Sequence, residues 1–161
     1  MADRMNVEAK HKEFIRASRE RVYDAFATSA GINGWWTEGG SVDARPDGVI
    51  VFRLVDWGPD QINAEFTGTV VEAERPRRFV YRWGGEGPQE ATTVELTFEE
   101  REDGTVVSVR EYGFVRVDQA LGNAAGWGEV LTLVKFWIEH GLSLHQTPAP
   151  HSSPRNWSAP R

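Results

Sequence analysis

The chain has no cysteine, no concentration of basic charge and no long apolar run. The lack of cysteine among its 161 residues excludes disulfides, thiolate metal ligands and a cysteine nucleophile. A net charge of −6, with arginines scattered rather than gathered in a stripe, argues against nucleic acid and anionic membranes as partners. No segment approaches the roughly 20 apolar residues of a membrane span, and the polar stretch Met1–Lys12 does not resemble a signal peptide. We therefore expect a cytoplasmic protein with no nucleic-acid or membrane partner.

Sequence patterns of metal sites and common catalytic centres are also missing. His140 and His145 are five residues apart across a predicted helix end, which is the wrong spacing for a shared metal face, and no carboxylate pair completes a site. There is no Gly-x-Ser-x-Gly, and Gly84-Gly85-Glu86-Gly87 lacks the Lys-Ser/Thr of a phosphate loop. We predict no metal, no cofactor and no assignable catalytic residue. Whether the protein is an enzyme stays open, with a non-enzymatic role favoured.

Tryptophan, in contrast, is abundant. A buried indole contributes a large apolar surface, but its N–H still needs a partner. A small domain with many such rings either walls a cavity or fills an aromatic core. Of the seven tryptophans, Trp157 lies in the tail and the other six lie in the part predicted to fold: Trp35, Trp36, Trp57, Trp83, Trp127 and Trp137.

Residue periodicity predicts a strand, two helical segments, a run of strands and one long final helix. The first strand spans Val7–Ala17, a helix runs from its N-cap at Ser18 to Gly31, and Gly31–Trp36 forms a short helix or turn. Trp57 falls in a predicted loop. Alternating apolar residues and turn motifs predict antiparallel strands over Val49–Val55, Ile62–Ala73, Arg78–Trp83, Thr92–Arg101 and Thr105–Tyr112.

Helical spacing returns after the last strand, with Asp118 as the expected N-cap and Gly141 as the stop. Residues 145–161 are rich in proline and serine and are predicted to be a disordered tail, which leaves a single domain over 1–144. The element order is that of an α+β fold in which the final helix covers one face of a curved sheet. Small residues in the first half of that helix predict a cavity there: Gly122, Ala124, Ala125, Gly126 and Gly128.

Four stretches of the chain are distinctive: Gly34-Trp35-Trp36-Thr37, Gly48–Arg53, Phe66–Trp83 and Gly126-Trp127 with the leucines and valine that follow. Together they resemble the activator of heat-shock-protein-90 ATPase homologue-like family of the START-like (SRPBCC) superfamily. The resemblance covers Val7 to Leu144. It implies the helix-grip fold, in which a curved antiparallel sheet wraps around a long C-terminal helix, with a deep pocket between them that binds apolar molecules and in some members supports cyclisation.

The aromatic face of the predicted sheet and the resemblance together give a set of expected ligand-binding residues. At the end of the last strand, alternation sends Arg110 and Tyr112 to one face and Glu111 to the other, and which of them faces the pocket stays open. An inward charge would need a partner or a ligand. The expected ligand-binding residues are Trp35, Trp36, Phe52, Phe66, Tyr81, Trp83, Phe98, Trp127 and Leu131.

Three functions compete. The favoured one is a binding protein that holds a small apolar or aromatic ligand in the pocket between sheet and helix. The second is an enzyme of the polyketide cyclase or dehydrase kind, which requires a carboxylate, tyrosine or arginine pointing into the pocket. The third is a chaperone-associated domain, which the family resemblance alone suggests. A monomer and a homodimer both remain open.

Overall fold

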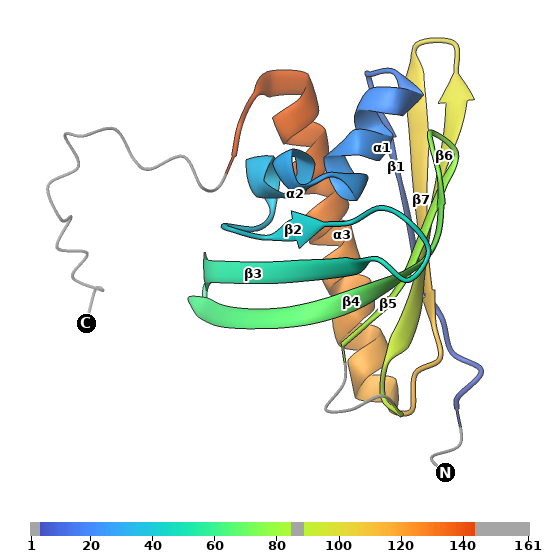
Figure 1. Ribbon diagram of the computed structural model, residues 1–161, viewed down its shortest axis with the longest axis vertical. Coiled ribbons are helices and arrows are strands. Elements are labelled where there is room, and N and C mark those ends of the chain that lie inside the picture. Colours follow the sequence, from blue (N-terminus) through green and yellow to red (C-terminus); the bar gives the residue numbers. More distant parts are fainter. Residues whose placement is uncertain (1–3, 85–88, 144–161) are drawn as a thin grey trace, which may run out of the picture.

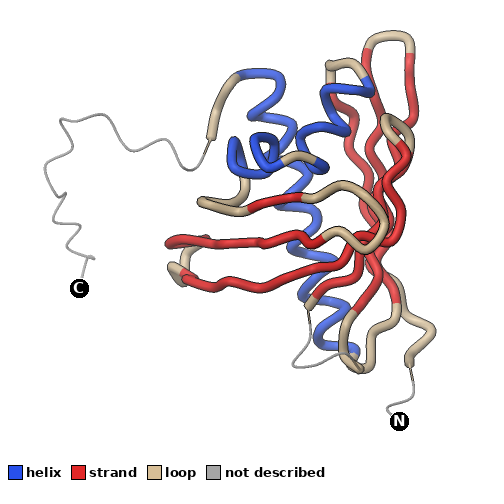
Figure 2. Tube along the Cα trace, in the orientation of Figure 1, coloured by secondary structure: helices blue, strands red, loops and turns tan. Residues whose placement is uncertain are grey.

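The computed structural model describes residues 4–84 and 89–143, and a seven-stranded antiparallel sheet forms most of it (Figures 1 and 2). The strand order is β1-β7-β6-β5-β4-β3-β2, so β2 to β7 form a meander and β1 pairs with β7. The predicted strands are confirmed to within two residues at most ends. Their bounds are β1 Ala9–Ile15, β2 Ser41–Val42, β3 Val49–Trp57, β4 Ile62–Glu74, β5 Arg78–Trp83, β6 Thr92–Arg101 and β7 Gly104–Tyr112.

Two short helices, α1 (Arg19–Ala27) and α2 (Ser29–Trp35), lie between β1 and β2. The Ser18 hydroxyl accepts a hydrogen bond from the Arg21 N–H at 3.3 Å, which confirms the predicted N-cap. The prediction that this helix continues to Gly31 is wrong. The Thr28 hydroxyl donates to the Asp24 carbonyl at 2.6 Å and accepts from the Gly31 N–H at 2.9 Å, so one side chain ends α1 and begins α2.

The long helix α3 (Val117–His140) crosses one face of the sheet (Figure 1). It begins one residue before Asp118, after Arg116, whose side chain forms no cap, so the predicted N-cap is wrong. Gly141 ends the helix in the left-handed conformation, and its N–H bonds to the Trp137 carbonyl at 2.9 Å, as predicted for the stop. The residues buried against the sheet follow helical spacing: Ala120, Trp127, Val130, Leu131, Val134 and Ile138.

Two irregularities curve the sheet around α3. The pairing register shifts between Val70 and Glu72 in β4 and between Leu54 and Trp57 in β3, and such bulges bend and twist a strand. The prediction that Trp57 lies in a loop is therefore wrong. Trp57 is the last residue of β3 and is half-buried. The result is the α+β helix-grip architecture, in which β3 and β4 extend over the first half of α3 (Figure 1).

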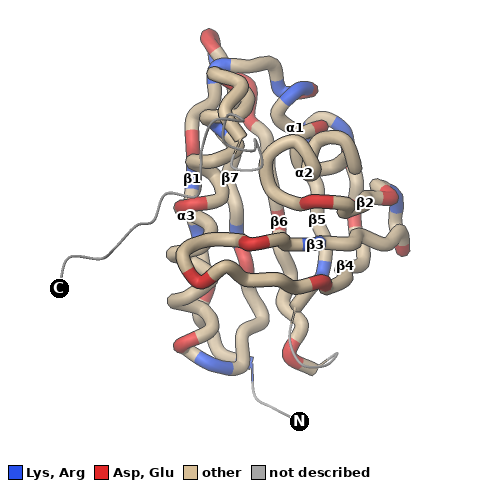
Figure 3. The backbone as a smooth tube through the Cα atoms, turned by 90° about the vertical axis from the view of Figure 1, so that its left-hand side faces the viewer, with Lys and Arg blue, Asp and Glu red and all other residues tan. Residues whose placement is uncertain are grey.

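Basic and acidic residues are scattered over the strands and helices seen in Figure 3, and this side of the described chain carries no continuous basic stripe. Within the described residues, no helix combines the length and apolarity that a bilayer crossing requires. The proposed domain boundary at 144, the predicted tail over 145–161 and residues 85–88, which include most of the Gly84-Gly85-Glu86-Gly87 segment, lie outside the described residues.

Candidate functional site

A cavity of about 150 Å³ lies between the first half of α3 and the strands β3, β4 and β5. Its volume matches that of cavities of roughly 150 Å³ that accept a benzene-sized guest. No Lys, Arg, Asp or Glu lines it, and Asn123 is its one polar side chain among the described residues. Five of its wall residues are aromatic. The described residues that line it are Trp36, Leu54, Trp57, Phe66, Trp83, Gly122, Asn123, Gly126, Trp127 and Val130.

Two glycines keep the helix side of this cavity open. A Cβ atom placed on Gly122 or Gly126 would meet no atom within 4 Å, although each glycine costs about 1 kcal/mol of helix propensity relative to alanine. Gly128, also expected near the cavity, points elsewhere: its Cβ would lie 3.7 Å from the ring of His11 on β1. Gly122 and Gly126 thus leave open space beside the side chains of Asn123, Trp127 and Val130, which reach the cavity from the same part of α3.

The indole rings of Trp36, Trp83 and Trp127, which line the cavity, contact one another at an angle rather than face to face. Trp36 lies with its ring centroid 5.9 Å from Trp83 and 6.0 Å from Trp127, at interplanar angles of 70° and 66°. The ring centroids of Trp83 of β5 and Trp127 of α3, both expected to bind the ligand, lie 5.6 Å apart. Rings at these centroid distances and angles pack against one another, so the three indoles form one connected aromatic surface.

Glu111 of β7 lies directly behind these indoles and is fully buried, with 0% of its surface exposed. Its Oε1 accepts hydrogen bonds from Trp83 Nε1 at 2.9 Å and Asn123 Nδ2 at 3.0 Å, and from the Thr92 hydroxyl at 2.5 Å. Its Oε2 accepts one from Trp127 Nε1 at 2.7 Å. The carboxylate therefore fixes two cavity-lining indoles and the cavity-lining amide at once.

The inward carboxylate meets no opposite charge. The ion pairs among the described residues do not include Glu111, so its four donors are all neutral. Nearby, the Tyr81 hydroxyl is buried and has no hydrogen-bond partner within the described part of the chain. Burial, and then the charge of Glu111, raise the pKa of Tyr81 well above its usual value of 10, so this hydroxyl keeps its proton. The site holds one uncompensated anion and one unused donor.

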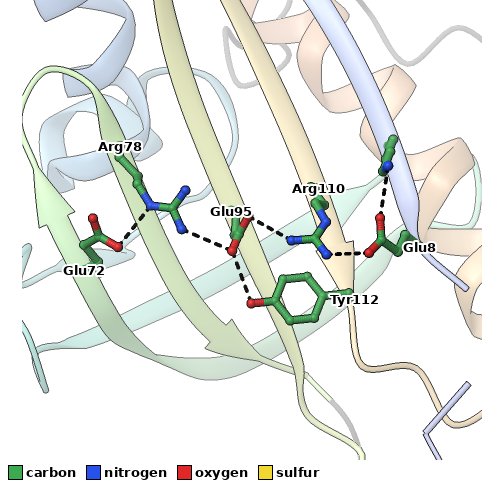
Figure 4. Close-up of polar contacts among 7 residues, drawn as sticks. Glu8, Glu72, Arg78, Glu95, Arg110 and Tyr112 are labelled. Atoms are coloured by element: carbon green, nitrogen blue, oxygen red, sulfur yellow. Dashed lines mark hydrogen bonds and ion pairs between the residues drawn. The ribbon is translucent and has the colours of Figure 1, made fainter. Parts of the chain in front are cut away.

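The neighbours of Glu111 on β7 face the other side of the sheet, which resolves the alternatives that alternation left open. Arg110 bonds to Glu95 at 3.2 Å and to Glu8 at 2.5 Å, and the Tyr112 hydroxyl donates to Glu95 at 3.2 Å (Figure 4). Both side chains belong to a row of ion pairs on the outer face. Of the three residues, Glu111 alone points toward α3.

The structure separates the predicted ligand-binding residues into three groups. Trp36, Phe66, Trp83 and Trp127 line the cavity. Phe52 and Tyr81 are buried one layer behind, with ring centroids 5.1 Å and 5.6 Å from Trp83. Three residues lie in the core away from the cavity lining: Trp35, Phe98 and Leu131.

The residues of the third group have packing partners of their own. The indole N–H of Trp35 donates to the Ala25 carbonyl at 3.0 Å, and its ring stacks on Trp36 at 5.2 Å. Phe98 packs against Tyr23 of α1 at 5.3 Å. Both members of the Trp35-Trp36 pair were predicted to bind the ligand, but Trp35 lies in the core and Trp36 lines the cavity.

The sequence argument missed several members of the site. It assigned Trp57 to a loop, left the orientation of Glu111 open, and gave no role to Leu54, Asn123 or Thr92. Val130 was predicted for the inner face of α3 but not for the cavity.

Two larger hollows adjoin the site. One, of about 350 Å³, shares Phe66, Trp83 and Asn123 with the cavity and reaches Gln119 at the start of α3. The other, of about 730 Å³, runs along β4 past Thr67, Thr69 and Arg82, whose side chains are exposed, and no residue of α3 lines it. That groove does not lie between the sheet and α3. The aromatic cavity lies between sheet and helix, and it is therefore the better candidate site despite its smaller volume.

Comparisons with known proteins agree with this architecture. The family model described as activator of Hsp90 ATPase homolog 1-like protein matches residues 16–135. The chain superposes on protein SSP2350 from Staphylococcus saprophyticus with a TM-score of 0.70 and 27% identity, covering 87% of this chain and 97% of that one. No match was found among curated proteins.

Two further solved structures share the fold at lower identity. The Aha1 dimer from Colwellia psychrerythraea gives a TM-score of 0.72 at 22% identity, over 84% of this chain and 98% of that one. CalU16 from Micromonospora echinospora gives 0.68 at 22% identity, over 88% and 83%.

Proposed function

The chain belongs to the activator of Hsp90 ATPase homolog 1-like family, and we propose that it holds a small apolar or aromatic ligand in the cavity between α3 and strands β3–β5. One observation carries this proposal. Five aromatic side chains line a space of about 150 Å³ that the opposing helix leaves open at Gly122 and Gly126. A core selected only for stability would fill such a space, because an empty apolar volume costs dispersion contacts.

Loss of binding on filling the cavity tests this proposal. Nitrobenzene, a small neutral aromatic quencher, is titrated against the tryptophan fluorescence of the full chain. We expect saturable quenching in the unmodified protein and at least a tenfold weaker affinity in Gly126→Leu, whose side chain would occupy the cavity. Ala125→Leu, an exposed change on the same helix turn, is the matched control and keeps the affinity within about twofold. Purely linear quenching, or equal saturation in Gly126→Leu, would contradict the proposal.

A second candidate function is acid–base catalysis of the cyclase or dehydrase kind. It requires a carboxylate or phenol facing inward, and Glu111 and Tyr81 both do so. Binding ranks first because both carboxylate oxygens are occupied and Glu111 does not line the cavity. Native mass spectrometry of protein purified from its own cells identifies any bound molecule. Incubating that molecule with the protein then tests for a product, which Tyr81→Phe should abolish if the phenol is the acid.

The family description also supports a contact with the Hsp90 chaperone. The ATPase rate of Hsp90 with and without this protein tests such a contact. Equal stimulation by the unmodified chain and Gly126→Leu would place the contact outside the cavity. Size-exclusion chromatography with light scattering distinguishes a monomer from a homodimer, the form in which the Colwellia Aha1 protein was solved.

A further inference from the structure

The charge distribution around the cavity suggests which class of ligand it takes. A buried carboxylate is ordinarily paired with a cation or a metal, because removing it from water is costly. Glu111 has neither among the described residues and is held by neutral donors alone. Both carboxylate oxygens accept hydrogen bonds, but no positively charged group among the described residues balances the negative charge.

The negative charge is placed directly behind the cavity wall. Indole and amide N–H groups only donate, so Trp83, Trp127 and Asn123 all meet Glu111 as an acceptor. The same three residues line the cavity. Glu111 is therefore separated from the cavity by the thickness of one side chain, and a low-dielectric interior weakens its field little over such a distance.

The aromatic walls add negative potential of their own. The faces of aromatic rings carry the negative part of their quadrupole, and an indole is the strongest cation-binding ring among the side chains. Four of the five rings are indoles, those of Trp36, Trp57, Trp83 and Trp127. Two of these donate their N–H to an anion, which pushes electron density back into the ring.

We infer that the ligand is a small organic cation with apolar substituents, an alkylated ammonium, held against the indole walls with Glu111 as its counter-charge. This inference rests on the proposed function and specifies its ligand. The apolar substituents contact the aromatic lining, while the positive charge of the ligand balances the negative charge of Glu111.

Other cations fit the lining less well. A metal ion needs several oxygen ligands, but Asn123 is the one lining side chain that carries an oxygen among the described residues. A primary ammonium has three N–H donors to satisfy and would leave most of them unpaired. A fully alkylated nitrogen has no such demand. The chain's net charge of −6 also favours the approach of a cation.

The test compares two molecules of nearly equal shape that differ in charge. Choline and its neutral carbon isostere, 3,3-dimethyl-1-butanol, are titrated by calorimetry against the full chain. We expect choline to bind at least about tenfold more tightly, as desolvated cation–π contacts predict. Equal or tighter binding of the alcohol overturns the inference.

The result separates this inference from the proposed function. If nitrobenzene saturates the cavity and Gly126→Leu blocks it, but choline has no advantage over the alcohol, the ligand class is wrong and the binding site stands. If none of the three probes binds saturably, both are wrong.

Two variants test whether the preference for choline over the alcohol depends on the negative charge of Glu111. Glu111→Gln keeps the side-chain volume and should reduce the choline-to-alcohol affinity ratio to the smaller preference that the indole faces alone supply, with alcohol binding within about threefold of the unmodified protein. Thr92→Val removes one hydrogen bond to the same carboxylate but not its charge, and should retain the ratio. Near-ultraviolet circular dichroism checks that each variant is folded. An unchanged ratio in folded Glu111→Gln overturns the role of the charge.

Trp57→Leu supplies an independent variant, because Trp57 is half-buried at the end of β3 and does not bond to Glu111. Loss of this ring should weaken choline binding at least about threefold more than alcohol binding. Equal weakening of both would mean that the rings act as apolar surface alone, which contradicts the inference.

Discussion

At the scale of single residues, the site depends on Glu111. Its two oxygens connect β5 through Trp83, β6 through Thr92 and α3 through Asn123 and Trp127. A buried polar network with every member satisfied fixes one arrangement of its side chains, since any other leaves a donor unpaired. Glu111 therefore sets the tilt of the cavity walls as well as the charge behind them.

Replacing this carboxylate should destabilise the protein according to how many donors it leaves unpaired. We expect Glu111→Leu to lose more stability than Glu111→Gln, because leucine accepts none of the four hydrogen bonds, and each buried unsatisfied donor costs about 1–3 kcal/mol. Urea unfolding at pH 7, followed by tryptophan fluorescence, measures both. If Glu111→Leu is the more stable of the two, the cost of burying the charge outweighs its hydrogen bonds.

The orientation of Glu111 could not be predicted from the sequence, for a specific reason. Alternation along β7 separates Glu111 from Arg110 and Tyr112, but Val106 and Val107 are adjacent valines and do not say which set faces the core. The buried set proves to be Thr105, Val107, Val109 and Glu111. Trp57 was missed because Trp57-Gly58-Pro59-Asp60 has the composition of a turn, and the turn begins only after it.

Asn123 illustrates a different limit. A lone polar residue among glycines and alanines carries no periodic pattern, and its role appears only when α3 is placed against β7. Trp83 and Trp127, in contrast, could be paired from the sequence, because each lies in phase with the apolar residues of its own element.

At the scale of elements, α3 has two halves with different tasks. Its second half packs Leu131, Val134 and Ile138 against the core, while its first half presents glycine to the cavity. Small residues there were sufficient to predict where the cavity lies, because their only evident benefit is space.

Alanine at the cavity glycines should therefore stabilise the protein. Gly122→Ala and Gly126→Ala each add a Cβ that meets nothing within 4 Å, and we expect each to raise the unfolding free energy by up to about 1 kcal/mol. Gly34→Ala in α2 is the contrasting variant. Its Cβ would lie 2.3 Å from the Trp137 ring, and we expect destabilisation. Thermal unfolding of the three variants decides, and a loss of stability in Gly126→Ala would show that the site has no room.

The junction of α1 and α2 shows why helix ends were predicted less well than strands. Periodicity continues through Thr28 toward Gly31, and only the hydroxyl's two hydrogen bonds show that one helix stops and another starts. Thr28→Val removes both bonds at nearly constant volume, so we expect a loss of about 1 kcal/mol that Thr28→Ser largely restores. Equal stability of the valine and serine variants in urea would argue against the shared cap.

At the scale of the whole molecule, the two faces of the sheet carry charge in opposite ways. The inner face holds one buried carboxylate without a cation, whereas the outer face carries a row of alternating charges. The row runs from β4 to the start of β1 through Glu72, Arg78, Glu95, Arg110, Glu8 and Lys10 (Figure 4). The outer pairs join five neighbouring strands, including the pair that closes the N-terminal strand onto the last one.

This outer row should make stability depend on pH in acid. Hydrogen bonds from Arg110 and then Lys10 lower the pKa of Glu8 from 4.5 to about 2. A carboxylate whose pKa is lower in the folded than in the unfolded chain stabilises the fold above the unfolded value, and this contribution disappears as the pH falls toward the folded one. The stabilising effect of Glu8 is therefore complete above about pH 4.5 and is lost between there and pH 2.

Glu8→Gln tests this expectation, because glutamine cannot titrate. Urea midpoints of the unmodified protein and Glu8→Gln, measured between pH 7 and pH 3, should differ most at neutral pH and converge in acid. Glu99→Gln, which removes a more exposed carboxylate paired with Arg101 outside the row, is the matched control and should follow the unmodified protein closely. A difference between Glu8→Gln and the unmodified protein that stays constant with pH would mean that Glu8 acts through packing rather than through its charge.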